Sequence, residues 1–313
     1  MVDGSKSNAI HVRSGVPQSS VLGPCLFLVY INDLPCRVKS NTRLFADDTA
    51  IDRKITSQDD QLLLQADLDA LAKWEDEWDM SFHPDKCIVL HVSRARAIKQ
   101  TDYYLHGQKL QSFESCKHLG VTLQTNSKFD LHITNVANSG NKMLGFARRN
   151  LRINSICMKN LAYNMLVRPK MEYASAVWDP YQSDQTAELE KVQRRAARFV
   201  TNKHRMTSSV GAMLTDLQWQ SLEQRRKYSR LTLLYKILEN QVSINCQELR
   251  PSVPRSRRES TAHPRQLDRC MCKNDYRLNA FLPRTIRDWN ALPEYAVLAP
   301  STNSFRRILS TLG

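Results

Sequence analysis

Two adjacent carboxylates, Asp47 and Asp48, are the residues of this sequence whose types and spacing point most directly to chemistry. They lie between two short apolar runs, residues 44–46 and 49–51, and this pattern predicts a β-hairpin with the two aspartates at its tight turn. Carboxylate oxygens are the hard ligands that Mg²⁺ prefers when it holds substrate phosphates. Asp is also common in solvated turns, so the pair alone leaves both interpretations open.

A loop and a helix are predicted upstream of this hairpin. The loop covers residues 14–20, and apolar residues then recur at helical spacing from Leu22 to Tyr30. Ser19 or Ser20 can cap the N-terminus of such a helix. The free N–H groups at a helix start suit a phosphate, whereas a capped core helix without a ligand is the alternative.

Several further segments follow in a fixed order along the chain. They are Trp74, Trp78, Lys86-Cys87, His118-Leu119-Gly120-Val121 and the run Val192 to Phe199. Together with the loop, the helix and the Phe45-Ala46-Asp47-Asp48 hairpin, they resemble the polymerase core of a reverse transcriptase. The specific resemblance is to non-LTR (LINE-type) retrotransposons of the jockey-like group. It covers nearly the whole chain, and the combination of motifs in one order is far more specific than any one motif.

This resemblance implies catalytic roles for three residues. Asp47 would be the main ligand of a two-metal site that uses Mg²⁺ (or Mn²⁺), and Asp48 an auxiliary carboxylate. Lys86 would lie near the triphosphate and donate a proton to the leaving pyrophosphate. A surface lysine without a catalytic role is the alternative for Lys86.

The resemblance also implies binding residues in two loops. The nucleotide pocket would be lined by the set Pro17, Gln18, Ser19, Phe45 and Ala46. Gln18 matches a glutamine of the family, whereas Ser19 stands where the family usually has glycine, so Ser19 narrows the pocket or strains the loop. Leu119 and Gly120 would form the primer grip, with Gly120 letting the primer backbone approach. A plain bulge glycine is the alternative there.

The composition favours a polyanionic partner. The 313 residues include 45 lysines and arginines against 31 acidic residues, which gives a net charge of +14 and a pI near 9.5. Nucleic acid is the first partner that this charge suggests, and an anionic membrane surface the second. No apolar run reaches transmembrane length and the N-terminus lacks a signal-peptide core, which favours an intracellular protein of the nucleus or cytoplasm that is not secreted.

The eight cysteines are scattered and indicate neither a disulfide framework nor a zinc module. Cys270 and Cys272, with His263 upstream, are too sparse for a four-ligand zinc site. Residues 59–82 predict one long amphipathic helix whose acidic residues, including Asp67 and Glu75, lie on its solvated face.

From Phe129 onward the pattern is helical, with helices predicted at 132–151, 155–167 (ended by Pro169), 184–202 and 219–239. Basic residues recur on the predicted outer faces of the last two, which suits contact with phosphates. Solvated surface is the alternative for each stripe. The candidate nucleic-acid contacts are Arg194, Arg195, Arg198, Lys203, Arg225 and Arg226.

The expected fold class is α+β. Residues 1–125 would be a partial reverse transcriptase palm, an antiparallel sheet with helices, whose fingers and first catalytic strand lie upstream. Residues 126–245 would be a helical, thumb-like nucleic-acid-binding region, and residues 246–313 a basic linker and C-terminal region. The implied partners are an RNA template, a DNA primer, deoxynucleoside triphosphates and the upstream polymerase and endonuclease segments, with no membrane.

The resemblance therefore implies a fragment of an RNA-directed DNA polymerase (reverse transcriptase) of a retrotransposon. Its reaction is template-directed nucleotidyl transfer by two-metal chemistry, and this chain is expected to be inactive alone. One alternative is a non-catalytic nucleic-acid-binding remnant, whose binding would not depend on Asp47 and Asp48. Another is a decayed reading frame, which would fold poorly because half of the palm sheet has an uncovered edge.

Overall fold

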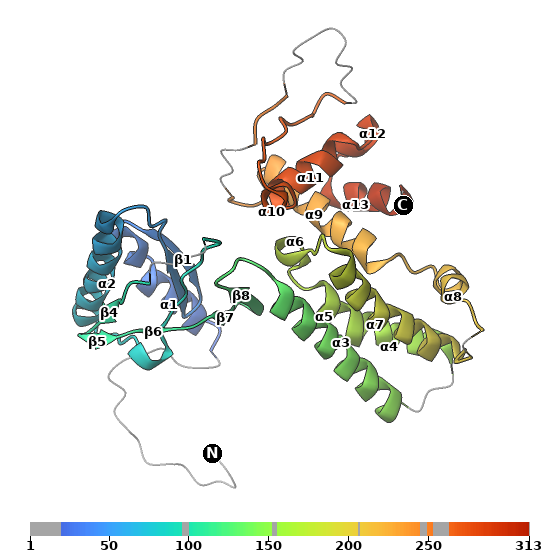
Figure 1. Ribbon diagram of the computed structural model, residues 1–313, viewed down its shortest axis with the longest axis horizontal. Coiled ribbons are helices and arrows are strands. Elements are labelled where there is room, and N and C mark those ends of the chain that lie inside the picture. The colour runs from blue at the N-terminus through green and yellow to red at the C-terminus, as the bar shows by residue number, and fades with distance from the viewer. Residues whose placement is uncertain are drawn as a thin grey trace. The chain divides into compact units, whose positions relative to one another are not determined.

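The computed structural model describes residues 20–95, 100–151, 155–205, 207–244, 249–252 and 263–312. The candidate nucleotide-binding residues Pro17, Gln18 and Ser19 lie outside the described residues. The chain forms two compact units: residues up to 116 together with 124–127, and residues 117–123 together with 128 onward. Short strands and helices make up the first unit and helices most of the second (Figure 1), which confirms the α+β class.

The first unit combines helices with two-stranded sheets. β1 pairs antiparallel with β2 and β4 with β5, whereas β3 runs parallel to β6. β7 pairs with β8, and most of this last hairpin, residues 117–123, belongs to the second unit. The strands are β1 (Asn41–Phe45), β2 (Asp48–Asp52), β3 (Ile88–Val89), β4 (Tyr104–Leu105), β5 (Gln108–Lys109), β6 (Gln111–Ser112), β7 (Ser115–His118) and β8 (Val121–Gln124). The helices are α1 (Gly23–Ile31) and α2 (Gln58–Trp78), with 3₁₀ turns at Leu34–Arg37 and Pro84–Lys86.

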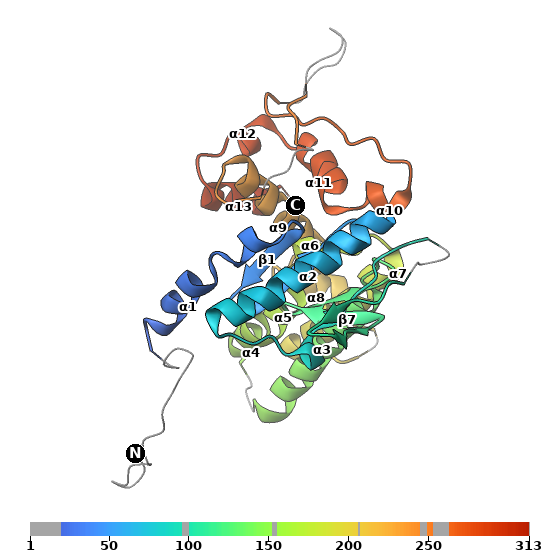
Figure 2. The same ribbon diagram turned by 90° about the vertical axis from the view of Figure 1, so that its left-hand side faces the viewer.

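Helix α2 is the longest element of the first unit and contributes to both of its clusters of apolar side chains. It starts at a capping box, in which the Ser57 hydroxyl accepts the Asp60 N–H and the Asp60 side chain accepts the Ser57 N–H. Leu71 and Trp74 of α2 are buried against residues of α1 and of the β1–β2 hairpin. Figure 2 shows α2 running beside β1 and α1.

Two acidic residues of α2 do not lie on the solvated face. Asp67 is buried and accepts the backbone N–H groups of Lys39 (2.9 Å) and Ser40 (2.9 Å). Glu75 is buried and accepts hydrogen bonds from the Phe82 N–H and from His106. The predicted solvent exposure of both residues is therefore wrong: each carboxylate satisfies polar groups that would otherwise be buried without partners.

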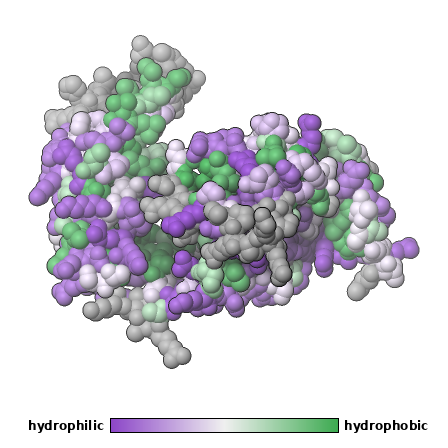
Figure 3. All heavy atoms as spheres, turned by 90° about the horizontal axis from the view of Figure 1, so that it is seen from above, coloured by the Kyte–Doolittle hydropathy of each residue, from purple (hydrophilic) through white to green (hydrophobic). Residues whose placement is uncertain are grey.

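Helix α1 exposes most of its apolar residues. The N-cap residue of α1 is Leu22, not the predicted Ser19 or Ser20, and it makes no side-chain cap bond, although the Ser20 hydroxyl accepts the Gly23 N–H (2.9 Å). Only Gly23 and Ile31 are buried within the helix. Leu22, Leu26 and Val29 are exposed. On the face of the molecule in Figure 3, apolar residues reach the surface in separate patches among hydrophilic ones.

The second unit is helical and has two clusters of buried side chains. Its helices are α3 (Asp130–Asn150), α4 (Ile156–Ala162), α5 (Arg168–Glu172), α6 (Ser175–Trp178), α7 (Ser183–Thr201), α8 (Val210–Asp216), α9 (Leu222–Leu238), α10 (Asp275–Leu278), α11 (Phe281–Asn290), α12 (Glu294–Val297) and α13 (Thr302–Thr311). One cluster lies among α3, α5 and α7. The other joins α9 to α11, α12 and α13, so residues from the predicted C-terminal region pack on the helical region.

Pro169 does not end the helix that begins at Ile156. A π-helical turn at Tyr163–Val167 leads directly into α5, which continues to Glu172. Pro169 occupies the first turn of α5, where the missing N–H of proline is tolerated. The wider turn just before it absorbs the break in hydrogen bonding. Among the described residues, no helix is both long enough and apolar enough to cross a membrane.

Candidate active site

The Asp47–Asp48 pair lies at the tip of the β1–β2 hairpin, shifted by one residue from the prediction. Phe45 pairs with Asp48, so the turn consists of Ala46 and Asp47 and Asp48 is the first residue of β2. Ala46 has a φ of +53°. Two-residue hairpin turns need a positive φ at their first position, and this need, rather than side-chain type, fixes where the turn falls.

The hairpin is held in place from its other end and from one face. Leu44 and Ile51 pack on the core that contains Trp74. Asp67 of α2 holds the backbone just before β1 through the N–H groups of Lys39 and Ser40. The strands therefore have a fixed register with their apolar face buried, and the tip projects from a supported base.

Both aspartates are exposed and unpaired within the described part of the chain. Neither carboxylate makes a hydrogen bond or ion pair there, whereas Asp52, on the same hairpin, is held by Arg43 and Asn41. Phe45, directly opposite Asp48, has 63% of its surface exposed. The tip thus offers free carboxylate oxygens beside an exposed aromatic ring, and Phe45 and Ala46 lie with the two carboxylates.

The donor set of the tip suits Mg²⁺ in part. Mg²⁺ is commonly held by one or two carboxylates, with water and substrate phosphates completing its shell, and Asp47 and Asp48 provide two. No group of three or more His, Cys, Asp or Glu residues able to hold a metal ion is found among the described residues. A ligand besides these two aspartates would have to come from substrate, from water or from outside the described residues.

Lys86 makes no hydrogen bond or ion pair with the β1–β2 hairpin in the described residues. It ends the 3₁₀ turn Pro84–Lys86 and is exposed, and its backbone N–H donates to the His83 carbonyl (2.9 Å). Its side chain makes no hydrogen bond or ion pair with Asp47 or Asp48 in the described residues. A role for Lys86 as proton donor stays a prediction.

Leu119 and Gly120 form the turn of the β7–β8 hairpin. Both have positive φ, +45° and +83°, as a tight two-residue turn requires. Tyr173 covers this turn: its hydroxyl donates to the Leu119 carbonyl (3.0 Å), and a Cβ on Gly120 would lie 2.9 Å from its ring. The close approach that Gly120 permits is to Tyr173 in this structure, and a role in gripping a primer stays a prediction.

Sequence reasoning missed two residues that position this turn. Tyr173, 58% exposed, follows α5 and has no sequence signal that links it to residue 120. His132 of α3 is buried and its Nδ1 accepts the Thr122 N–H of β8 (3.1 Å). Burial lowers the pKa of His132, with the nearby charge of Lys117 acting in the same direction, so the imidazole is neutral when it accepts this bond.

Helix α7 presents its basic residues as predicted. Arg194 and Arg195 are exposed, and Arg198 is partly exposed. The opposite face, which includes Leu189, Val192, Ala196, Phe199 and Val200, is buried, so this part of the prediction is confirmed. Lys203 is exposed and pairs with Asp216 of α8 (3.7 Å).

Helix α9 does not present the predicted basic stripe. Arg226 is fully buried, and its Nε donates to Asp179 (2.7 Å). Arg230 is also buried and donates to the other oxygen of Asp179 (2.8 Å). The surface position predicted for Arg226 is wrong, because a carboxylate 47 residues away neutralises it in the interior.

Arg225 is partly exposed, but its guanidinium is already paired with a carboxylate. Its guanidinium forms a two-pronged ion pair with Glu172, one arm of which (Nη2 to Oε2) measures 2.9 Å. This hydrogen bond is the main reason that the pKa of Arg225 is raised above its ordinary value. Its charge is already compensated, so Arg225 is a poorer phosphate ligand than the arginines of α7.

Comparisons with known proteins bear on the first unit above all. The family model described as "Reverse transcriptase (RNA-dependent DNA polymerase)" matches residues 1–123, which include the whole Asp47–Asp48 hairpin and the Leu119–Gly120 turn. No solved structure gave a significant match.

Three curated relatives extend the similarity beyond this segment. The RNA-directed DNA polymerase from mobile element jockey of Drosophila melanogaster is 32% identical over 148 residues, which are 43% of this chain and 16% of that protein. The polymerase of the same name from Drosophila funebris is 32% identical over 193 residues, covering 56% of this chain and 20% of that protein. The probable RNA-directed DNA polymerase from transposon X-element of Drosophila melanogaster is 24% identical over 207 residues, which are 61% of this chain and 22% of that protein.

The chain thus spans about a fifth of the length of the curated relatives that it matches. The matched segment begins at residue 1 and holds the hairpin whose tip carries two free carboxylates. Residues 1–123 are thus similar to the reverse transcriptase family, and the chain is similar to part of the polymerases of the jockey and X-element mobile elements.

Proposed function

We propose that this chain contributes the Asp47–Asp48 hairpin to an RNA-directed DNA polymerase that extends a DNA primer on an RNA template. The observation that carries the proposal is the pair of free, exposed carboxylates at a supported hairpin tip inside the segment that matches the family. The substrates would be deoxynucleoside triphosphates. Transfer of a nucleotidyl group to the primer 3′-hydroxyl fits a site built from carboxylates.

The family generally uses divalent metal ions, and Mg²⁺ or Mn²⁺ at Asp47 and Asp48 is part of the proposal. Such an ion would supply charge stabilisation for the reacting phosphate and lower the pKa of an attacking hydroxyl. The residues of this chain would provide position: Asp47 on the turn and Asp48 at the start of β2, with Phe45 and Ala46 beside them to border the nucleotide.

Among the described residues, no cation forms an ion pair with the two aspartates of the tip. Two carboxylates in sequence repel each other, and an ion or a substrate-bound ion relieves that repulsion. Arg43 lies on the same hairpin, yet it pairs with Asp52 and not with Asp47 or Asp48. The two tip carboxylates are therefore left for a ligand from outside the described residues.

The test is primer extension on an RNA template with Mg²⁺. It compares this chain alone with this chain joined to the upstream segment of the jockey polymerase of Drosophila melanogaster. We expect extension in the joined protein only. Asp47→Asn should abolish it, and Asp76→Asn, an exposed acidic residue on α2, should leave it unchanged.

Two results would contradict the proposal. One is a folded joined protein without extension activity. The other is extension that survives Asp47→Asn and Asp48→Asn together. Robust extension by this chain alone would contradict the narrower expectation that the hairpin needs further polymerase segments.

A further inference from the structure

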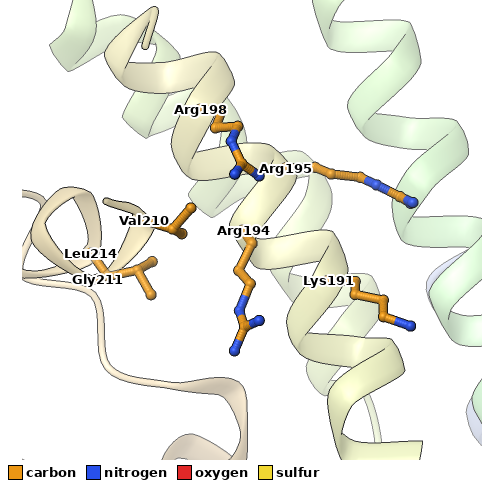
Figure 4. Close-up of a pocket in the computed structure, with 7 residues that line it drawn as sticks. All are labelled: Lys191, Arg194, Arg195, Arg198, Val210, Gly211 and Leu214. Carbon is orange, nitrogen blue, oxygen red and sulfur yellow. The ribbon is translucent and has the colours of Figure 1, made fainter. Parts of the chain in front are cut away.

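Exposed and buried charges of this chain differ in what holds them. Cations of the exposed kind line a groove between α7 and α8, about 510 Å³ in volume, and Figure 4 shows them extending from α7. The lining residues are Lys191, Arg194, Arg195, Arg198, Val210, Gly211 and Leu214. An exposed charge can ordinarily be replaced with little effect on folding. A buried charge needs specific partners instead, so the partners of such a charge indicate its role.

Asp67 of α2 is a buried charge whose partners are backbone groups. The residue is 4% exposed, its Oδ1 accepts the Lys39 N–H (2.9 Å) and its Oδ2 accepts the Ser40 N–H (2.9 Å). In the described residues it forms no ion pair. Asp67 lies about two and a half turns after the start of α2, so interaction with the helix dipole, which is confined to the terminal turns, does not account for its charge. Both carboxylate oxygens thus hold the residues that lead into β1.

The other strand of the hairpin is also attached to α2. Arg53 directly follows β2, and its Nη1 donates to the Ser40 hydroxyl (3.3 Å). Its Nε lies 3.7 Å from an oxygen of Asp60, in the first turn of α2. Hydrogen bonds from Thr56 and Ser57 hold the pKa of Asp60 well below its usual range, so this carboxylate is charged at neutral pH. Both ends of the hairpin base are therefore attached to one helix.

These attachments are far from the aspartates of the tip. β1 and β2 have five residues each, so about 17 Å separates base from tip at about 3.4 Å per residue. Among the described residues this sheet has only these two strands, and no third strand fixes the tip. A rotation of about 3° at the base would therefore move the tip by about 1 Å. In a catalytic site a misplacement of about 1 Å can cost about 100-fold in rate.

We propose that Asp67 and Arg53 are positioning residues, which set where the Asp47 and Asp48 carboxylates lie. Mg²⁺ requires near-ideal octahedral geometry, so a displaced pair of carboxylates would bind it less well. The effect on the reaction rests on the proposed function. The hold of Asp67 and Arg53 on the hairpin can be measured without any reaction.

The first test is hydrogen–deuterium exchange of the chain alone, followed by mass spectrometry of its peptides. Asp67→Asn keeps the size of the side chain but leaves one acceptor oxygen for two N–H donors. Exchange in residues 39–52 should then be faster by about 10-fold or more, as expected when a buried donor loses its partner. Asp76→Asn is the control, because it removes the same charge from an exposed position of α2. It should leave this exchange unchanged.

The second test is primer extension by the joined protein at a series of Mg²⁺ concentrations. Asp67→Asn should lower kcat by about 10- to 100-fold and move the midpoint of Mg²⁺ activation to a higher concentration. Arg53→Gln should have a smaller effect of the same kind, because its side chain is 20% exposed and the Asp67 bonds remain. Leu105→Ala is the control for stability. Leu105 is buried in a separate cluster of the first unit, so its loss should destabilise that unit without moving the Mg²⁺ midpoint.

Unchanged exchange in residues 39–52 of a folded Asp67→Asn chain would overturn the proposal. So would a Mg²⁺ midpoint that stays in place in Asp67→Asn or moves equally in Leu105→Ala, because Asp67 would then be a structural residue only. If circular dichroism shows that Asp67→Asn does not fold, Arg53→Gln decides by the same two measurements. An unmodified joined protein without extension would contradict the proposed function alone, and exchange would still decide whether the two residues hold the hairpin.

Discussion

Gly120 is the residue whose replacement the structure tolerates least at the β7–β8 turn. Its φ is +83°, and a Cβ would lie 2.9 Å from Cε1 of Tyr173. The Tyr173 hydroxyl donates to the Leu119 carbonyl, so moving the ring away would break this hydrogen bond. Backbone strain and a steric clash therefore act together at one position.

We expect Gly120→Ala to lower the free energy of unfolding of the second unit by about 1–3 kcal/mol, since a side chain at positive φ is strained and Tyr173 must also shift. Urea denaturation followed by circular dichroism measures the change. Gly107→Ala is the control, because Gly107 has a φ of +72° but no atom within 4 Å of the added Cβ. It should cost only about 1–2 kcal/mol; a larger effect than that of Gly120→Ala would contradict this explanation.

Single residues were predictable where their role is local. The Asp47–Asp48 hairpin follows from short-range alternation, although the turn falls one residue earlier than predicted because Ala46 takes the positive φ. Asp67 and Arg226 were not predictable. Each is a charged residue whose partner lies far along the chain, and helical periodicity gives no sign of that partner.

At the scale of elements, Asp179 joins three helices of the second unit. It follows α6 directly, and its carboxylate accepts hydrogen bonds from Arg226 and Arg230 of α9. Arg284 of α11 lies 3.3 Å from the same carboxylate. The side chain of Asp179 is 3% exposed. Burial of its charge costs free energy, and the ion pairs with these arginines offset that cost.

We expect Asp179→Asn to destabilise the second unit by about 3–5 kcal/mol, because it leaves buried arginine charges without a counter-ion. Thermal and urea unfolding both report this change. Glu172→Gln is the control: it also removes an arginine partner, that of Arg225, but at a site that is partly open to solvent. It should cost about 1 kcal/mol or less, and equal effects of the two variants would show that burial is not the cause.

Elements were predictable where one face is consistently apolar. Helix α7 follows its predicted bounds to within one residue at each end, and its buried face is the predicted one. The helix at Ile156 was not predicted correctly, because a proline is ordinarily a stop signal. Only the π-helical turn before Pro169, which depends on packing around Tyr163, lets the chain continue to Glu172.

At the scale of the whole molecule, the chain divides into two units that each contain their own buried clusters. Trp74 and Leu71 belong to the first unit and have their packing partners within it. The α3–α5–α7 and α9–α13 clusters belong to the second. A separate core is what allows a segment of a chain to unfold as a unit of its own.

We expect calorimetry to show two unfolding transitions, of which Trp74→Ala moves only one. Loss of this buried indole should lower the stability of the first unit by about 3–5 kcal/mol and leave the transition of the second unit in place. Phe305→Ala is the reciprocal control, since Phe305 is buried in the α9–α13 cluster. A single transition that both variants shift equally would contradict independent cores.

The sequence predicted the net charge of the whole molecule and the kind of partner it favours better than it predicted how the helices pack. A net charge of +14 pointed to a polyanionic partner, but not to the groove where cations gather. That groove requires α8 to lie against α7, and α8 is a short helix with no charge pattern of its own.

The hairpin tip has a consequence for how this chain has been selected. Ala46 stands at a positive φ, Phe45 is exposed, and two like charges are adjacent. Asn-Gly at this turn would remove the backbone strain, and a neutral residue at position 48 would remove the repulsion. Selection for folding alone would favour those replacements. The tip is therefore less stable than these replacements would make it, which fits the chemistry proposed for the two carboxylates.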